Sequence, residues 1–446
     1  MKRNIIIALS LFAAFQVQAQ QMLSLDEVKQ RALEYNMAAR TADNAIQQAE
    51  EQKKEAFTKY FPTISALGMG FQTNHDILKK DFKLLDKIPE PILSKIPPEL
   101  APLIPQEISF GILDKGIMAG VTAIQPVFAG GRIINGNKLA KINVQAGYLQ
   151  KQMTSNTVTL TAEQYYWQII TLKEKQKTLD AVGEMLDKYA KDADVAVKAG
   201  VGMRNDLLAV KLKQNEIESN KLKLANGLKL AKMVLAQYIG MEGQDIDVIS
   251  SADPSQLPPY PIVKANHEEA VAITPEYRLL QKKVEATTLQ RKMEVGKNLP
   301  SIGIGAGYNY YKMDGRMENN FGAIFATVSI PISQWWGGSH AIKRKKLAEQ
   351  NAREQLEDNS QLLKIRMQKN WNDVDDAYKQ LKLAKESIEQ SEENLRLNRD
   401  FYQAGTVPMN DLLNAQQLYQ QSRDRYTDAY AQLQTKILEY KQSIGE

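Results

Sequence analysis

Apolar positions recur with a helical period over most of the chain, and the longest series are heptads. Three heptad series run over 207–235, 377–402 and 412–440. Many of their seam positions hold small or polar residues, which favours broad walls of packed helices over a tight two-stranded coil. The pattern therefore predicts long, mainly α-helical segments. The predicted helices are 131–199, 205–239, 339–404 and 410–444.

Four shorter segments alternate apolar and polar residues, which is the period of a strand with one apolar face. The clearest runs from Ile302 to Tyr310, where every second residue is apolar or aromatic. Its partner carries Ile324, Ala326 and Val328 at the same spacing. The chain is therefore expected to add four strands to its helices. The predicted strands are 63–72, 116–128, 301–311 and 321–332, with a loop at 73–115 between the first two.

The two halves of the chain repeat one another at a constant offset. Gly200 and Gly405 lie in matching tripeptides, Asp206 and Asp411 lie in matching Asn-Asp-Leu-Leu segments, and each pair is 205 residues apart. A constant register over this distance predicts a tandem duplication. Several prolines between the halves prevent one continuous helix there.

The duplication predicts the domain organisation. Each half is expected to run helix, strand, loop, strand, long helix, tip and helix. The predicted divisions are a signal peptide at 1–19, a first repeat at 20–240, a proline-rich linker at 241–265 and a second repeat at 266–446.

The N-terminal segment has the features of a secretory signal. Lys2 and Arg3 precede an apolar stretch at 5–15, and Ala19 ends a small-residue cleavage motif. The apolar stretch is too short to span a bilayer, which takes about 20 helical residues. We therefore expect export and cleavage after Ala19.

Composition removes several classes of function. The chain has no cysteine and three histidines, so we predict no disulfide, metal site, cofactor or cysteine-based catalysis, and no enzymatic activity. Charged residues make up 24% of the chain, which excludes a polytopic helical membrane protein. The formal charge of +5 becomes +3 without Lys2 and Arg3, so nucleic acid is not an expected partner.

Two architectures fit these elements. One is a secreted periplasmic coiled-coil scaffold whose strands pack internally. The other is a tube made from several copies, because a scaffold does not need apolar-faced strands between its helices. Four strands cannot close a membrane barrel, which needs about eight or more. Three copies would supply twelve strands and would remove the exposed sheet edges.

The duplicated halves, the prolines between helix and strand, and the twin tips followed by Asn-Asp-Leu-Leu resemble the TolC-type outer-membrane efflux protein family. The resemblance covers essentially the whole mature chain. It implies a homotrimer with a twelve-stranded β-barrel in the lipid of the Gram-negative outer membrane and a periplasmic α-helical coiled-coil barrel. It also implies a passive exit channel of a tripartite efflux pump or type I secretion system. Its partners would be a periplasmic adaptor (membrane fusion protein) and an inner-membrane transporter of RND or ABC type.

The resemblance also implies roles for residues near the two tips. It implies an aperture that involves Asp206, Asp411 and Tyr402. Val407 and Asn414 depart from the family pattern, in which a basic residue and a second acid can occur at these places, so the closing contacts are expected to be weaker or built differently. Glycine turns and carboxylates at helix starts also serve purely structural purposes in helical hairpins. The residues expected to contact the adaptor are Ala199, Gly200, Val201, Ala404, Gly405 and Thr406.

Two adjacent tryptophans follow the last predicted strand. Trp335 and Trp336 stand where the chain returns from strand to helix. Tryptophan is enriched at membrane–water interfaces. We therefore predict that both lie at the membrane interface, on the periplasmic side.

Overall fold

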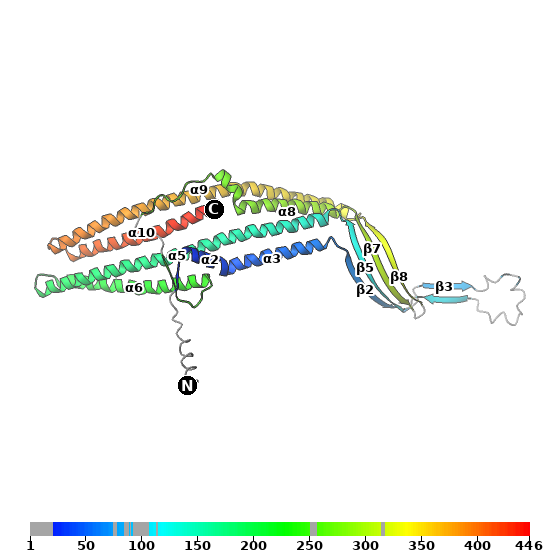
Figure 1. Cartoon of the computed structure of the whole chain (residues 1–446), viewed down its shortest axis with the longest axis horizontal. Coiled ribbons are helices and arrows are strands. Elements are labelled where there is room, and N and C mark those ends of the chain that lie inside the picture. Colours follow the sequence, from blue (N-terminus) through cyan, green and yellow to red (C-terminus); the bar gives the residue numbers. More distant parts are fainter. Residues whose placement is uncertain are drawn as a thin grey trace, which may run out of the picture. The chain divides into compact units, whose positions relative to one another are not determined.

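The structure is a computed structural model that describes residues 21–74, 78–83, 89, 91, 107–112, 115–249, 257–313 and 317–446. The predicted signal peptide lies outside these residues. Long helices dominate the described chain, and a four-stranded sheet is its largest β element (Figure 1). The mainly α fold with four principal strands, predicted from the sequence, is confirmed.

The elements follow one another in the order of their bounds. The helices are α2 (Leu25–Tyr35), α3 (Met37–Thr58), α5 (Arg132–Lys198), α6 (Arg204–Tyr238), α7 (His267–Ala270), α8 (Pro275–Lys297), α9 (Gln334–Gln403) and α10 (Met409–Ser443), with a 3₁₀ turn at Val271–Ile273. The strands are β1 (Gln21–Leu23), β2 (Thr63–Gln72), β3 (Leu78–Lys83), β4 (Glu107–Ile112), β5 (Lys115–Phe128), β6 (Ile246–Val248), β7 (Ser301–Met313) and β8 (Met317–Ser329).

The chain divides into two compact units. The first comprises Met1–Ala49, Asn143–Val284 and Asn351–Glu446, and the second comprises Glu50–Ile142 and Glu285–Gln350. Each unit combines segments from both halves of the chain. The units therefore cut across the repeats, and the tandem duplication stays a prediction.

The sheet of the second unit is antiparallel, in the order β2-β5-β7-β8. One row across the four strands is Ile64, Ala123, Ala306 and Ile324. Because side chains alternate along a strand, this row defines one face. The face is apolar and open to its surroundings, since the side chains of Ile64 and Ile324 are 72% and 86% exposed.

On the opposite face of the sheet, glycines make room for side chains of the neighbouring strands. A Cβ added at Gly305 would lie 2.4 Å from the ring of Phe325, and one added at Gly120 would lie 2.2 Å from Oδ1 of Asn309. The glycines thus leave room for larger side chains of the neighbouring strand to lie flat across the sheet. The two faces differ most on β7, where Ile302, Ile304 and Ala306 on one face alternate with Gly303, Gly305 and Gly307 on the other.

The heptads of the sequence are the buried seams of the helical unit. Leu412, Leu433 and Tyr440 of α10 are at most 1% exposed, and Leu381 of α9 is fully buried. Val210 on α6 is likewise fully buried. At about 1.5 Å per residue, α5 and α9 are each on the order of 100 Å long. Within the described residues, no helix has a stretch both apolar and long enough to cross a membrane.

The helix expected before the first strand is two helices. Asn36 interrupts it with an extended backbone, and its N–H closes the end of α2 on the carbonyl of Ala32. Its side-chain Oδ1 accepts a hydrogen bond from the N–H of Ala38 at 2.9 Å. Asparagine is a preferred N-cap, so one residue ends α2 and begins α3.

Two predicted ranges hold additional strands. In the range assigned to a loop at 73–115, β3 and β4 pair antiparallel. In the range assigned to the linker at 241–265, β6 pairs in parallel with β1. Strands of three to six residues are too short to show a period, and the β1–β6 pairing joins segments more than 200 residues apart. The helix expected before the third principal strand is also broken, since Pro275 begins α8 after α7 and a 3₁₀ turn.

The junction between the last strand and α9 lies earlier than predicted. The strand expected at 321–332 is β8, which begins at Met317, where Glu318 pairs with Lys312 at 3.0 Å across the hairpin. It ends at Ser329, because Pro331 has no N–H for the sheet. The helix expected from residue 339 begins at Gln334 and passes through Gly338. A Cβ at Gly338 would lie 1.9 Å from Oδ1 of Asn298, so this glycine permits close packing and does not end the helix.

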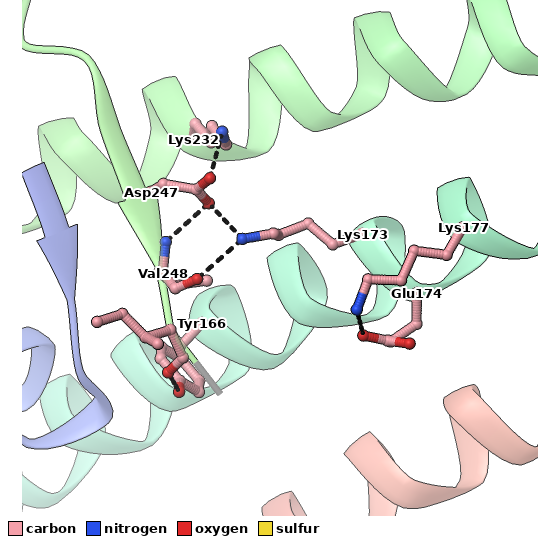
Figure 2. A network of polar contacts seen from close by, with 8 residues as sticks. Tyr166, Lys173, Glu174, Lys177, Lys232, Asp247 and Val248 are labelled. Carbon is pink, nitrogen blue, oxygen red and sulfur yellow. Dashed lines mark hydrogen bonds and ion pairs between the residues drawn. The ribbon is translucent and has the colours of Figure 1, made fainter. Parts of the chain in front are cut away.

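A buried carboxylate ties β6 to two long helices. Figure 2 shows Asp247 accepting hydrogen bonds from Lys173 at 3.0 Å and from the N–H of Val248 at 2.8 Å. Lys232 of α6 lies 3.2 Å from its other oxygen. The hydroxyl of Tyr166 on α5 donates to the carbonyl of Ile249, just beyond the strand. These contacts anchor the three-residue strand, which backbone pairing alone would hold weakly.

The environment of Asp247 lowers its pKa. Burial of the carboxyl opposes ionisation, but the Val248 N–H and the ammonium groups of Lys173 and Lys232 outweigh burial, so the pKa of Asp247 lies below its ordinary value. The resulting stabilisation is fully present above the pKa of the unfolded carboxyl and is lost as the pH falls through the folded value.

We predict that Asp247→Asn lowers the free energy of unfolding by about 1–3 kcal/mol at neutral pH, because two partly buried ammonium groups lose their counter-charge. Thermal unfolding followed by circular dichroism measures the change. The difference from the wild type should vanish only below the ordinary aspartate pKa. Glu242→Gln, an exposed carboxylate of the same linker, is the control and should have little effect. Equal losses in the two variants would contradict the assigned role of Asp247.

Candidate functional site

The first tip closes with a Schellman turn. Gly200 has φ +73°, and its N–H donates to the carbonyl of Val197 at 3.1 Å. The N–H of Val201 donates to the carbonyl of Ala196 at 3.0 Å. These two bonds satisfy the last carbonyls of α5, and the left-handed conformation they need is adopted most easily by glycine. The chain then enters α6 after Met203.

The second tip has the same geometry. Gly405 has φ +70°, and its N–H donates to the carbonyl of Tyr402 at 2.9 Å. The N–H of Thr406 donates to the carbonyl of Phe401 at 2.9 Å, and the Thr406 hydroxyl donates to the same carbonyl at 3.0 Å. Pro408 then precedes α10. The matching tripeptides of the sequence are therefore two helix-ending turns of one type.

The two tips differ in the side chain that follows the glycine. In a Schellman turn this position often packs back onto the helix. Val201 instead is 84% exposed, and Met203 beside it is 73% exposed. At the second tip, the hydroxyl of Thr406 donates a hydrogen bond to the carbonyl of Phe401. Ala199 and Ala404 are exposed as well. The first tip thus presents an apolar surface, and the second presents a polar one.

Both hairpins share one apolar cluster beneath the tips. Leu186 and Ala193 of α5, Val210 of α6, Leu395 of α9 and Leu412 of α10 belong to it, and each is almost fully buried. Tyr402 packs against its edge. The turns are therefore held by helices that pack together, although each tip itself stands free of this packing.

Tyr402 and Asp206 come together from different tips. Burial is the largest cause that raises the pKa of the Tyr402 phenol, and the carboxylates of Asp206 and Asp192 raise it further. The structure thus brings together two of the three residues assigned to the aperture. Asp192 was not predicted, because it belongs to no motif and acts on Tyr402 only through the packing of α5 beside α9.

Asp411 stands apart from this group. It lies exposed in the first turn of α10, where a carboxylate interacts favourably with the helix dipole. Asn414 is exposed one turn further on, and Val407 is half-buried in the tip. Asp411 is therefore not among the carboxylates that act on Tyr402.

The two tryptophans lie in the first turn of α9. The indole N–H of Trp335 donates to the carbonyl of Asn298 at 3.0 Å, which links α9 to the residue just after α8. Trp336 makes no such bond among the described contacts and is 78% exposed. Their position at a membrane interface stays a prediction, with Trp336 the better placed of the two.

The comparisons with known proteins agree with this geometry. The model of the family "Outer membrane efflux protein" matches residues 268–446. No curated protein matches the chain. Residues 268–446 are thus similar in sequence to this family.

Solved structures of this fold align over nearly the whole chain. The outer membrane protein VceC from Vibrio cholerae has a TM-score of 0.72 at 13% identity, over 94% of this chain and 96% of VceC. The MtrE outer membrane channel from Neisseria gonorrhoeae has a TM-score of 0.74 at 15% identity, over 94% and 88%. CusC has a TM-score of 0.77 at 13% identity, over 96% and 93%. The family model covers the second half alone, whereas the shared fold covers both halves.

We predict that Gly200→Ala and Gly405→Ala each destabilise their turn by about 1–2 kcal/mol, because an L-residue with a side chain is strained at positive φ. No atom would lie within 4 Å of either added Cβ, so strain and not collision is tested. Amide hydrogen exchange of Val201 and Thr406 should accelerate roughly tenfold.

Gly227→Ala is the matched control. Gly227 lies inside α6, and its added Cβ also meets nothing within 4 Å. Alanine there should stabilise the helix by about 1 kcal/mol. Unchanged exchange at the tips, or the same loss in all three variants, would contradict the turn assignment.

Proposed function

We propose that this chain is an outer-membrane efflux channel, working as a homotrimeric passive conduit whose sheets join into one twelve-stranded β-barrel and whose helices line a periplasmic tunnel. A periplasmic adaptor would dock on the tips and connect the conduit to an inner-membrane transporter of RND or ABC type. The observation that carries the proposal is the sheet of a single chain, which exposes an apolar face and leaves two edges unpaired.

The sheet supports closure between copies. Its edge strands are β2 and β8, which pair on one side only within the described chain. In a bilayer the free N–H and C=O groups of an edge have no water to bind, which costs several kcal/mol for each group. Pairing β2 of one copy with β8 of the next satisfies both edges. The apolar face would then meet lipid, and the glycine-rich face would line the pore.

Apolar stripes on two helices also support assembly with further copies. At 3.6 residues per turn, the exposed apolar residues of α6 and those of α9 from Leu362 onward each fall within about 100° around their helix axis. An exposed stripe of this kind calls for a partner surface. The proposed partner is the same chain, because a closed ring presents every stripe to a neighbouring copy. The stripe residues are Leu208, Leu212, Leu222, Leu230 and Met233 on α6 and Leu362, Ile365, Leu383, Leu397 and Phe401 on α9.

The tips support adaptor docking. All six tip residues are exposed, and Val201 and Met203 add an apolar surface that no other described residue covers. A helical hairpin of the adaptor could pack its apolar face on this surface. Val201 would supply most of the contact area at the first tip, whereas Thr406 would contribute less at the second because its hydroxyl is already bound.

Asp206, Asp411 and Tyr402 are the proposed aperture. Threefold symmetry would place each as a ring of three, and rings of carboxylates govern passage through narrow pores. The carboxylate of Asp206 acts electrostatically on Tyr402 of the other hairpin within one chain. Since Val407 cannot pair with a carboxylate, this pair would carry most of the closing interaction.

The direct test is conductance in planar bilayers, with the oligomer mass determined in the same preparation. We expect conducting trimers. Leu212→Gln with Leu230→Gln should shift the trimer towards monomer, because both leucines lie in the α6 stripe, whereas Val201→Gln at the tip should leave the mass unchanged. A water-soluble species without conductance would contradict the channel and favour a periplasmic scaffold.

We expect Asp206→Ala with Asp411→Ala to raise single-channel conductance severalfold, because both proposed carboxylate rings are lost. Asp206→Ala alone should account for more of the rise than Asp411→Ala, because Asp206 also loses its interaction with Tyr402. Glu184→Ala, which removes an exposed carboxylate from α5, is the control. Unchanged conductance in the double variant would remove these carboxylates from the mechanism.

A further inference from the structure

A pocket with a cationic wall lies where α3 and α5 approach the sheet. It has a volume of about 520 Å³ and lies between the last turns of α3 and the first turns of α5. Lys53, Lys138 and Lys141 contribute its cations, and Phe57 and Tyr60 contribute its aromatic rings. None of the functions assigned above uses this pocket.

The pocket has a rigid floor. The side-chain amide of Asn137 donates to the carbonyl of Ala56 at 2.8 Å and to that of Ile133 at 3.0 Å. The first bond joins α5 to α3, and together the two use both donors of the amide. Asn137 therefore holds the two helices at a fixed separation and leaves the lysines as the donors that face a ligand.

The lysines are available to an anion. Lys53, Lys138 and Lys141 are exposed, and no ion pair of theirs occurs among the described contacts. Lys54, at the rim, already pairs with Glu51 at 2.7 Å. Glu50 is the single acidic residue of the lining. The pocket is therefore positively charged on balance.

Aromatic residues and then lysines follow one another along the helices away from the sheet, which is the order expected at a membrane surface. Tyr60 lies three residues before β2 begins at Thr63, and Phe57 packs edge-on against Tyr60 and Phe61. Measured along their helices at 1.5 Å per residue, Lys53 and Lys141 lie about 10–15 Å further from the strands than Tyr60 and the start of α5, respectively. Aromatic side chains favour the glycerol and headgroup region of a bilayer, and lysines beyond them meet phosphate.

We infer that this pocket binds the headgroup of an anionic phospholipid from the periplasmic leaflet of the outer membrane. The lysine ammonium groups would hold the phosphate, and Phe57 and Tyr60 would contact the glycerol and the start of the acyl chains. The inference rests on the proposed function, which places the sheet in the membrane and the helices in the periplasm. Ligand binding here is separate from the conduit, the tips and the aperture.

The test measures lipid binding to purified trimers by native mass spectrometry. The probes are dioctanoyl phosphatidylglycerol, dioctanoyl phosphatidylcholine and inorganic phosphate. We expect the wild type to prefer phosphatidylglycerol. Replacing all three lysines by glutamine should weaken that binding by about fivefold per lysine, on the order of 100-fold in total. The corresponding arginine variant should retain binding, because it keeps the charges.

A second triple variant controls for net charge. Lys188→Gln, Lys211→Gln and Lys223→Gln remove three exposed lysines of α5 and α6 outside the pocket and should leave binding unchanged. Equal binding of phosphatidylcholine, or an unaffected pocket variant, would overturn the inference. Displacement of the lipid by inorganic phosphate at equal concentration would assign the pocket to free phosphate and would also overturn it.

Oligomer mass and conductance separate this inference from the proposed function. If the pocket variant no longer forms trimers, the lysines serve contacts between copies and the lipid assignment is wrong. A wild-type protein that does not conduct contradicts the channel whatever lipid it binds. If the trimers conduct and the pocket variant binds lipid as tightly as the wild type, the lipid site alone is contradicted.

Discussion

Backbone hydrogen bonding along β2 and β8 is the constraint on which the other features depend. A four-stranded sheet satisfies its inner strands and leaves each edge with a row of free donors and acceptors. Water can satisfy an edge, but hydrocarbon cannot, and the exposed Ile64–Ile324 face is suited to hydrocarbon. In the proposed trimer both needs are met at once, because joining edges between copies removes them and directs the apolar face outward. The helices that continue from these strands must then follow the same ring.

The long helices also need partner surfaces, and they meet this need through side-chain packing. A heptad seam buries one side of each long helix, as Leu381, Leu412 and Leu433 show. In the proposed tunnel, a wall of helices around the lumen needs contacts on two sides, and the exposed stripes of α6 and α9 would supply the second. Small and polar residues at the seams, such as Ser422 and Gln416, are buried without closing the helices into a tight bundle. The width of the proposed tunnel would thus be obtained at the expense of apolar burial within the single chain.

Charged groups have different roles in three parts of the molecule. Asp247 is buried between two lysines and fixes β6 to α5 and α6. Asp206 sits near the half-buried Tyr402 at the tips, where a weaker interaction can be broken when the conduit opens. Lys53, Lys138 and Lys141 of the pocket beside the sheet have no ion pair among the described contacts and would face the proposed membrane surface.

Periodicity in the sequence determined the class of fold, the long helices, the four principal strands and both glycine turns, because each depends on local burial or on a local backbone angle. Gly200 and Gly405 could be placed within their turns from neighbouring residues alone. Features that join distant residues were decided by tertiary packing. The β1–β6 pairing, the passage of α9 through Gly338 beside Asn298, and the interaction of Tyr402 with Asp206 each depend on a partner remote in the chain. A local pattern records whether a residue is buried, but only the packed structure records which residue covers it.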